Sequence, residues 1–465
     1  MLFEKVLIAN RGEISRRVLR TCKRLGMRTV AVYSEADAGA PHVSEADEAV
    51  LLGPAPAKES YLNTAALLSA IERTGADAVH PGYGFLSENS GFARSVAAMG
   101  VTFIGPPPEV LDAFGDKMKA RHVALSAGTR PVPGTDEPVA IDTPEALERA
   151  RAEAARIGYP ILAKPVGGGG GIGMQIVRDE AGLPRALKSC SDRGRASFAD
   201  ARVYLERYVS SPRHIEVQIF CDTHGNAYAL GERECSVQRR HQKIIEESPS
   251  PAAFFRGEAG EARRAALHEA ALRVVKKVGY VGAGTCEFIA DDQGELFFLE
   301  VNARLQVEHV VTEMVTGLDL VHLQLRVAKG EVLPDLSRVP RRGHSIEARV
   351  YAEDPAKMFI PKPGPIAALS WVSGEGEVQT ERLRVESGVR AGNEVTPYYD
   401  PMIAKVVSWG ETREAAIAEL DRALGTTEIT PTVTNMAFVR RVLASDEFRG
   451  GQYDTGFAEL LAKRP

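Results

Sequence analysis

The sequence predicts an α/β protein that opens with a doubly wound parallel sheet and ends in a strand-rich region. Its first hundred residues alternate short apolar runs with segments whose apolar residues recur at helical spacing. The expected strands are residues 5–9, 28–33, 77–80 and 101–104, and the expected helices are residues 12–25, 63–73 and 90–99. Such alternation favours a parallel sheet with helices on both faces. Only Gly12 follows the first strand closely, so the three-glycine dinucleotide fingerprint is absent.

The rest of the chain divides into a bridge, a small unit, a mixed region and a strand-rich end. The expected segments are a helical bridge at 106–128, a small unit at 131–203, a mixed region at 204–329, a linker at 334–340, and final strands at 344–352 and 395–409 before C-terminal helices. Within the small unit we expect a helix at 144–157 and strands at 161–166 and 174–177. Gly26 is expected to end the first helix as its C′ residue.

Composition favours a multidomain intracellular protein. The chain has 465 residues, 44% of them hydrophobic, and single cores stop growing well below this length. A net charge of −5 offers no basic surface for nucleic acid or anionic membranes. The five cysteines form no C-x-x-C pair, which suits a reducing compartment. Because no apolar run approaches the ~18 residues needed to span a bilayer, we expect a soluble, cytoplasmic protein.

A glycine run between two expected strands is the first candidate binding feature. Five consecutive glycines, residues 167–171, follow Lys164. Backbone N–H groups of such a loop can close around an anion, and the lysine adds a point charge for phosphate. The segment lacks the Gly-Lys-Ser/Thr ending of a Walker A loop. It is either a flexible surface turn or, in its small separate unit, a mobile lid.

An expected hairpin at residues 286–304 is the second candidate. In its second strand Glu300, Asn302 and Arg304 alternate with apolar residues, so period two places them on one face. Carboxylate and amide oxygens are ligands suited to Mg²⁺, and Arg304 adds a cation for an anionic substrate. The alternative is an ordinary solvated face.

The register of this hairpin decides whether Glu287 joins that face. A four-residue loop at 291–294 would pair Ala290 with Glu295, and it would place Glu287 across from Phe298 and on the same face as Glu300. A slip of one residue would send Glu287 to the opposite face.

The third candidate is the cation-rich run at residues 232–243. It can bind phosphate or nucleic acid, and the acidic balance of the whole chain favours a small anion. The alternative is a solvated charge run, the commoner fate of such strings. The ten histidines show no metal-ligand spacing, so no zinc site is expected, and His80 and His309 fit ordinary, partly buried histidines.

Nine segments, in order along nearly the whole chain, resemble the biotin carboxylase family. They are IANRGEI (8–14), HPGYGFLSEN (80–89), GDK (115–117), KPVGGGGG (164–171), ERECSVQRRHQKIIEESPS (232–250), GAGTCEF (282–288), EVNARLQVEH (300–309), EARVYAEDP (347–355) and PYYDPMIAK (397–405). The resemblance implies an ATP-grasp fold of three parts. These are an N-terminal α/β domain at residues 1–115, an ATP-grasp domain at 116–330 with a mobile lid at about 131–203, and a strand-rich C-terminal domain at 341–448.

The resemblance also assigns residues to substrates by position. It implies ATP contacts at Lys117, Lys164, Gly170, Gly171, Met174, Glu206, Arg207, Tyr208, Val209, His214, Gln238, His241, Glu287 and Glu300. It implies metal ligands at Glu287, Glu300 and Asn302, and bicarbonate contacts at Lys243, Arg304, Gln306 and Val307. Glu308 matches the base that deprotonates bicarbonate, and Arg349 and Tyr83 match groups beside biotin. The implied catalytic residues are Arg304, Glu308, Lys243 and Arg349.

The implied activity is carboxylation of biotin by ATP and bicarbonate, through carboxyphosphate. The implied cofactors are ATP and two ions of Mg²⁺ or Mn²⁺. Biotin is implied as a substrate on a carrier, because the chain has no Met-Lys-Met attachment sequence. A biotin carboxyl carrier protein and a carboxyltransferase are therefore the implied partners, unless this chain is part of a longer polypeptide. A homodimer also fits the family.

Three positions depart from the family pattern. Ile172 stands in the glycine loop where the family usually has Arg or Lys, which predicts weaker lid closure. Arg207 replaces a common Lys in a backbone role, so little effect is expected. Residues 373–384 are longer and more charged than the family's turn, which can lie at the dimer interface.

Two other functions are compatible with these motifs. Another ATP-grasp ligase, of the carboxylate–amine or carbamoyl-phosphate type, could share the lid and the metal face. A catalytically degenerate subunit could bind nucleotide without turnover, and Ile172 is the only sequence support for it.

Overall fold

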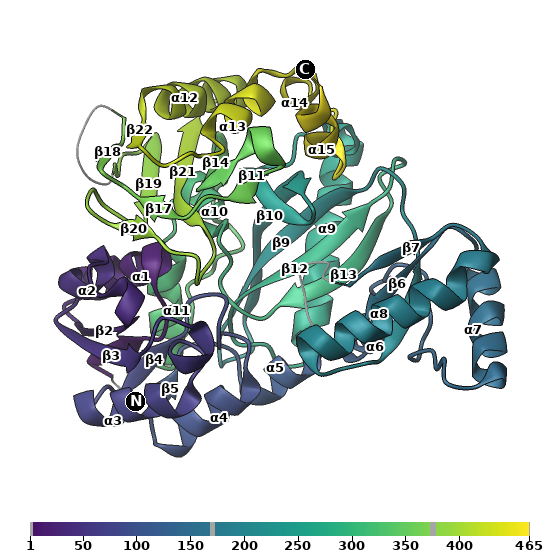
Figure 1. Ribbon diagram of the computed structural model, residues 1–465, viewed down its shortest axis with the longest axis horizontal. Helices are drawn as coiled ribbons and strands as arrows, with labels where there is room; N and C mark the ends of the chain where they lie inside the picture. The colour runs from purple at the N-terminus through teal and green to yellow at the C-terminus, as the bar shows by residue number, and fades with distance from the viewer. Residues whose placement is uncertain (1–2, 168–172, 373–377, 465) are drawn as a thin grey trace.

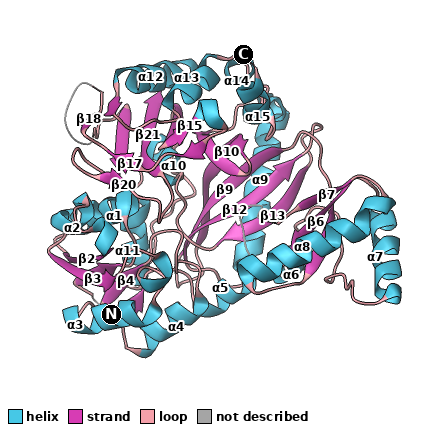
Figure 2. Ribbon diagram, in the orientation of Figure 1, coloured by secondary structure: helices cyan, strands magenta, loops and turns pink. Residues whose placement is uncertain are grey.

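The computed structural model describes residues 3–167, 173–372 and 378–464, and three groups of strands organise them (Figure 1). A parallel sheet lies at the N-terminal end, a small sheet projects to one side, and a long antiparallel sheet runs through the middle of the molecule (Figure 2). Ile172 and part of the 373–384 segment fall outside the described residues.

The N-terminal sheet has the parallel arrangement that the alternating pattern predicts. Its order is β3-β2-β1-β4-β5, and each neighbouring pair is parallel. The strands are β1 (Lys5–Ile8), β2 (Arg28–Ser34), β3 (Glu48–Gly53), β4 (Ala78–His80) and β5 (Thr102–Phe103). The intervening helices are α1 (Gly12–Arg24), α2 (Pro41–Glu45), α3 (Thr64–Thr74) and α4 (Ser90–Ala98). The sequence patterns do not predict β3 and α2, and β3 is an edge strand with mostly exposed or half-buried side chains.

Local side chains set the helix ends of this region. The side chain of Asn63 accepts a hydrogen bond from the backbone of α3, and Asn89 does the same for α4. Gly26 follows α1 with φ of +71°, as expected for a C′ glycine.

Two helices rather than one connect the parallel sheet to the rest. They are α5 (Pro108–Phe114) and α6 (Lys117–Ser126). Asp116 caps α6 by accepting hydrogen bonds from the backbone of Met118 and Lys119. Lys117 is therefore the first residue of α6, where its backbone N–H donates to the carbonyl of Val166 at 3.4 Å.

The small sheet consists of three antiparallel strands with two helices. Its order is β7-β6-β8, from β6 (Ile161–Pro165), β7 (Gln175–Val177) and β8 (Val203–Arg207). The helices are α7 (Pro144–Ile157) and α8 (Leu183–Phe198). Their buried apolar residues, alanines in α7 and mainly leucines in α8, pack with those of the strands in a separate core. The predicted strand, glycine run and strand thus occur in order, and β6 and β7 pair around residues 168–172.

The long antiparallel sheet has eight strands and joins the mixed region to the C-terminal region. Its order is β13-β12-β9-β10-β11-β14-β21-β19. These are β9 (Arg213–Cys221), β10 (Ala227–Arg239), β11 (Gln242–Ser248), β12 (Gly282–Ala290), β13 (Leu296–Asn302), β14 (His344–Tyr351), β19 (Leu383–Ser387) and β21 (Met402–Gly410). The region at 395–409, expected to be rich in strand, divides between β20 (Glu394–Val395) and β21, which are separate strands. Pro397 and Pro401 lie between them, and proline cannot donate to a ladder.

Helices cover both faces of the C-terminal half of this sheet. α12 (Arg413–Thr426) packs with Ile346 and Ala348 on the apolar face. α10 (His309–Thr316) contacts β10, β11, β14 and β21 on the other face, toward which Glu347 and Arg349 alternate. The remaining helices are α9 (Gly257–Lys277), α11 (Leu320–Ala328), α13 (Met436–Ala444), α14 (Asp446–Arg449) and α15 (Phe457–Lys463).

The remaining strands are two or three residues long. They are β15 (Glu353–Asp354), β16 (Ile360–Pro361), β17 (Gly364–Pro365), β18 (Ala368–Ser370) and β22 (Glu428–Thr430). Within the described ranges, no helix has the length and apolarity required to cross a membrane.

Candidate active site

A cavity of about 750 Å³ opens between the small sheet and the long sheet. Lys164 and Glu206 line it from the small sheet, and His214, Lys243 and Glu287 line it from the long sheet. Other lining residues come from the start of α6, the segment after β13, and the C-terminal region, namely Lys117, Arg304, Gln306, Val307, Glu308, Arg349 and Asp400. The small sheet, the long sheet and the C-terminal region therefore all contribute to one cavity.

The hairpin of β12 and β13 presents two carboxylates side by side. Glu287 is directly opposite Glu300, and Thr285 is opposite Asn302. Asn302 donates from Nδ2 to Oε1 of Glu287 at 2.8 Å. Lys117 Nζ lies 3.6 Å from Oε2 of Glu300. These oxygen donors, clustered on one face at the cavity wall, suit a hard divalent cation such as Mg²⁺.

The register of this hairpin differs from the predicted one. Ala290 pairs with Leu296 and not with Glu295, so the predicted pairing is wrong by one residue. A β-bulge then inserts one extra residue in β13, because Phe288 pairs with Phe298 whereas Glu287 pairs with Glu300. The bulge restores the predicted face, and it brings the two carboxylates directly opposite each other.

Lys243 lies among three carboxylates beside this face. Its Nζ is 2.6 Å from Glu308 Oε1, 2.7 Å from Glu216 Oε2 and 3.3 Å from Glu287 Oε1. Burial by itself would lower the pKa of Lys243, but Cys235 and these carboxylates raise it well above its usual value. The ammonium therefore stays charged and compensates the carboxylates.

Glu308 contacts cations on both sides. Arg349 donates from Nη2 to Glu308 Oε2 at 3.0 Å, opposite the contact with Lys243. Burial would raise the pKa of Glu308, but Lys243, Arg349 and Arg233 lower it well below its usual value. Glu308 is therefore ionised at neutral pH and free of a proton.

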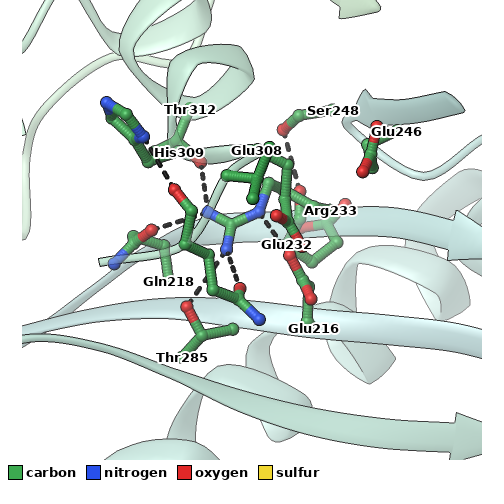
Figure 3. A network of polar contacts seen from close by, with 12 residues as sticks. Glu216, Gln218, Glu232, Arg233, Glu246, Ser248, Thr285, Glu308, His309 and Thr312 are labelled. Carbon is green, nitrogen blue, oxygen red and sulfur yellow. Dashed lines mark hydrogen bonds and ion pairs between the residues drawn. The ribbon is translucent and has the colours of Figure 1, made fainter. Parts of the chain in front are cut away.

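Below these groups, Arg233 forms a buried network that the sequence analysis did not single out (Figure 3). Its fully buried guanidinium donates to Glu216 at 2.5 Å, to Gln218 at 2.6 Å and to Gln306 at 2.7 Å. Two further bonds reach the hydroxyls of Thr285 and Thr312. One arginine thus ties β9, β12, α10 and the segment after β13 together.

The charged run at 232–243 is buried over most of its length, although Arg240 and His241 are exposed. Glu232, Arg233, Glu234 and Gln238 are all buried, so the solvated alternative is wrong for them. Gln238 and Lys243 line the cavity.

Arg304 is held between the N-terminal region and the face formed by Glu287, Glu300 and Asn302. Its Nε donates to Oε2 of Glu88 at 2.9 Å, and its Nη2 donates to Oδ1 of Asn302 at 3.0 Å. Oε1 of Glu88 accepts a hydrogen bond from the backbone of Ala303 at 2.9 Å. Glu88 therefore links the loop after β4 to the cavity wall.

Further bonds position the neighbouring segment. Gln306 donates to Glu287 Oε1 at 3.0 Å, and the carbonyl of Val307 accepts from Lys405 Nζ at 2.7 Å. His214 Nε2 lies 3.2 Å from Glu287 Oε2. Burial lowers the pKa of His214, but the charge of Glu287 outweighs it and raises that pKa overall.

The side of the cavity toward the small sheet holds the residues assigned to ATP. Lys164 forms an ion pair with Glu206. Both residues line the cavity together with Met174, Arg207, Tyr208, Val209, Gln238 and His241. Gly170 and Gly171 lie outside the described residues, so their assignment stays a prediction.

Tyr83 is the one described residue of the assigned set that does not line the cavity. Its ring lies 5.9 Å from Lys405 Nζ, and its buried hydroxyl has no hydrogen-bond partner within the described residues. Its contact with biotin stays a prediction. His80 and His309 are fully buried, more so than expected.

Sequence analysis assigned no individual role to Glu88, Glu216 or Glu246, and it included Arg233 only as part of the cation-rich run at 232–243. One available signal was the alternation of His214, Glu216 and Gln218 in β9, which marks a polar face like that of β13. The other three depend on contacts between elements that are distant in sequence.

The fold and this site define an ATP-grasp protein: two sheets enclose a cavity that combines lysines with paired carboxylates. Three family models together match most of the chain. The biotin carboxylase N-terminal domain matches residues 2–111, the carbamoyl-phosphate synthase L chain ATP-binding domain matches residues 116–336, and the biotin carboxylase C-terminal domain matches residues 347–460. The chain belongs to the biotin carboxylase family.

Similar proteins agree with this assignment. A methylcrotonoyl-CoA carboxylase alpha subunit from Dictyostelium discoideum is 48% identical over 98% of this chain, which spans only 63% of that protein. A biotin carboxylase from Halalkalibacterium halodurans is 46% identical over 98% of this chain and 97% of its own length.

Solved structures extend the likeness to three dimensions. A Campylobacter jejuni biotin carboxylase superposes with a TM-score of 0.92 at 42% identity, covering 99% of both chains. The biotin carboxylase domain of Hydrogenobacter thermophilus 2-oxoglutarate carboxylase, bound to MgADP and bicarbonate, gives a TM-score of 0.92 at 40% identity over 100% of both chains.

Proposed function

We propose that this chain uses ATP and bicarbonate to carboxylate biotin carried on another protein, the first half-reaction of a biotin-dependent carboxylase. The observation that carries the proposal is the position of Glu308. It contacts Lys243 on one side and Arg349 on the other, beside a face of oxygen donors. A base for bicarbonate and a cation for biotin are thus adjacent.

Lysines and oxygen donors would bind the nucleotide. Lys117 and Lys164 would neutralise phosphate oxygens, and the strand from Glu206 to Val209 would contact adenine. The face formed by Glu287, Glu300 and Asn302 fits Mg²⁺ or Mn²⁺, in one or two ions, because it offers only oxygen ligands. A bound divalent ion supplies charge neutralisation for phosphoryl transfer.

Residues on the other side of this face would bind and activate bicarbonate. Lys243, Arg304, Gln306 and the backbone at Val307 would orient the anion, and Glu308 would take its proton. The deprotonated oxygen then attacks the γ-phosphorus of ATP, which releases ADP and forms carboxyphosphate. Pairing with Arg349 weakens Glu308 as a base, so a shift of Arg349 toward biotin would strengthen it.

Biotin carboxylation would follow in the same cavity. Carboxyphosphate breaks into CO₂ and phosphate, and the phosphate removes the proton from biotin N1′. The guanidinium of Arg349 would stabilise the resulting enolate oxygen, and N1′ then attacks CO₂. One such charged donor in a site that excludes water lowers the activation barrier by about 3 kcal/mol. Closure of the small-sheet unit, the proposed lid at about 131–203, would exclude water.

The relatives suggest the partners. A biotinylated carrier and a carboxyltransferase would complete the reaction, either as separate chains or within a longer polypeptide. The Hydrogenobacter thermophilus domain is described as a dimer, which supports a homodimer here.

The decisive experiment measures phosphate release from Mg-ATP with and without bicarbonate and with and without free biotin. Turnover that requires bicarbonate and rises with biotin is expected. A Glu308→Gln protein, prepared identically, controls for contaminating ATPases and should be inactive. Turnover indifferent to biotin would instead favour another ATP-grasp ligase. ATP binding without turnover, even with a carrier protein added, would favour a degenerate subunit.

A further inference from the structure

Two buried glutamates face each other behind Arg349. Pairing of β11 with β14 places Glu246 directly opposite Glu347, and both are 0% exposed. Arg349 follows two positions after Glu347 on the same strand face. Figure 3 shows Glu246 at the edge of the Arg233 network. The proposed mechanism assigns no role to either carboxyl group.

The two carboxyl groups have unequal partners. Glu246 Oε1 accepts a hydrogen bond from Arg349 Nε at 2.6 Å and also contacts Nη2. Both oxygens of Glu347 lack a hydrogen-bond partner within the described residues. An ionised carboxylate buried without a hydrogen bond is strongly disfavoured. Arg349 therefore favours the anionic form of Glu246 and offsets part of the effect of its burial, whereas Glu347 has no such support.

The charges that face Glu347 do not compensate it. They are Glu246 on β11, Lys405 on β21, Glu308 before α10, and Arg349 on the same strand as Glu347. Arg349 contacts Glu246 and Glu308, and Lys405 contacts Val307 O at 2.7 Å and Glu13 at 3.3 Å. Both cations are thus committed to other anions.

The directions in which the pKa values of the two carboxyl groups shift agree with this geometry. Burial, together with the charges of Glu246 and Glu308, raises the pKa of Glu347 well above its usual value, although Lys405 and Arg349 oppose the shift. Burial and Glu308 raise the pKa of Glu246 to about 7, although Arg349 and Lys243 lower it. Two like charges at facing strand positions are unfavourable, so the pair holds at least one proton at neutral pH.

We propose that Glu246 is a positioning residue that holds Arg349 for the biotin step, and that Glu347 opposite it is a neutral carboxylic acid. The inference rests on the proposed function and deepens it. Glu246 holds Arg349 through Nε, which leaves the Nη groups to exchange between Glu308 and biotin. A second ionised carboxylate behind the guanidinium would pull it away from biotin, and the neutral state of Glu347 prevents this.

The pair offers two isosteric substitutions at facing, equally buried positions. Glu246→Gln removes the charge that holds Arg349, so biotin-dependent kcat should fall about tenfold or more. The KM for ATP should stay within about twofold, and bicarbonate-dependent phosphate release without biotin should change less than about threefold. Glu347→Gln replaces a neutral group with a neutral group and should leave both reactions within about twofold.

Three outcomes would overturn the assignment. The first is an equal loss of biotin-dependent turnover in Glu347→Gln. The second is a parallel loss of biotin-dependent and biotin-independent turnover in Glu246→Gln, which a general structural role would produce. The third is full biotin-dependent activity in Glu246→Gln.

An infrared measurement tests Glu347 without depending on the function. A carboxylic acid C=O band at neutral pH should be present in the original protein and absent in Glu347→Gln. If no such band is lost, Glu347 is ionised and the inference is wrong. If instead the original protein shows no biotin-stimulated turnover, the proposed function fails, whatever the infrared result.

Discussion

Helix α10 and the residue just before it contribute one carboxylate to each of two buried clusters of charge. The pocket cluster consists of Glu216, Lys243, Glu287, Glu308 and Arg349, with Glu308 as the residue that precedes α10. The interface cluster consists of Arg17, Glu313, Asp319, Arg384 and Glu386, with Glu313 within α10. Both clusters combine arginine or lysine with carboxylates, and their side chains are similarly buried. They differ in whether their residues line the cavity.

In the interface cluster the charged groups form ion pairs with one another. Glu313 accepts from Arg17 at 2.6 Å and from Arg384 at 2.8 Å, and Leu320 N donates to it at 2.7 Å. These contacts join α1 of the parallel-sheet region to α10 and β19, and none of the five residues lines the cavity.

In the pocket cluster every member except Glu216 lines the cavity. Its charges can therefore exchange protein partners for substrate atoms. Buried ion pairs of the same chemistry thus stabilise the arrangement of domains in one place and prepare a reaction in the other, and access to the cavity decides which.

The largest expected effect is on the pocket side. Lys243→Gln removes the cation shared by three carboxylates and should slow bicarbonate-dependent phosphate release by about 100-fold to 1,000-fold. ATP binding, measured by equilibrium titration, should be largely retained because the proposed contact of Lys243 is with bicarbonate and not with the nucleotide. Activity equal to that of the original protein would refute the role given to Lys243. It would also contradict the conclusion that the pocket cluster serves the reaction.

On the interface side the loss should appear in stability. Glu313→Gln leaves Arg17 and Arg384 without their shared anion, and breaking such a buried pair costs about 3 kcal/mol or more. Chemical denaturation would measure the change. Turnover per folded molecule should stay close to that of the original protein.

A matched control is Glu269→Gln, which removes an exposed pair with Arg273 and should cost less than about 1 kcal/mol. If Glu313→Gln lowers turnover without lowering stability, the interface cluster also serves the reaction, and the proposed difference between the two clusters is wrong.

Neighbouring residues of β11 should show opposite pH dependence. Burial would raise the pKa of Glu247, but Arg413 and His344 lower it to about 2, so its stabilisation is present above pH ~4.5 and lost as pH falls toward 2. Glu247→Gln should therefore cost about 3 kcal/mol at pH 7 and less at pH 3.

The contribution of Glu246 to stability changes with pH in the opposite direction to that of Glu247. Because its folded-state pKa is raised to about 7, its contribution to stability is present below pH ~4.5 and declines as pH rises through 7. Glu246→Gln should remove that decline. Denaturation series from pH 3 to pH 8 would measure both variants, and parallel curves for the two would contradict the assigned directions.

The smallest expected effect concerns the link from the parallel-sheet region to the cavity. Glu88 is partly exposed, so its bond to Arg304 is worth little in stability. Glu88→Gln should raise the KM for bicarbonate by about threefold with kcat nearly unchanged. A change in the KM for ATP instead would place Arg304 on the nucleotide side of the cavity.

Local pattern in the sequence was sufficient for much of the fold. The spacing of apolar residues identified β1, β2, β4, β6 and β7 and the helices beside them, because strand and helix periodicity depends on near neighbours. The same reasoning placed Glu300 and Asn302 on one face. Longer family motifs located most residues that line the cavity.

Other features depend on contacts that no local pattern encodes. The bulge that sets Glu287 opposite Glu300 and the break between β20 and β21 reflect the geometry of sheet pairing. The pairing of β11 with β14 joins strands about a hundred residues apart into one sheet, and so it places Glu246 opposite Glu347.

The sequence by itself therefore determined the elements, the polar faces and the residue types of the site. Only the tertiary structure decided which charges share a partner: that Arg233 ties four segments together, and that Glu308 lies between Lys243 and Arg349. The physical reason is that periodicity is a property of near neighbours along the chain. Ion pairing in a buried site depends on distances of a few ångströms between side chains, which are set when whole elements pack.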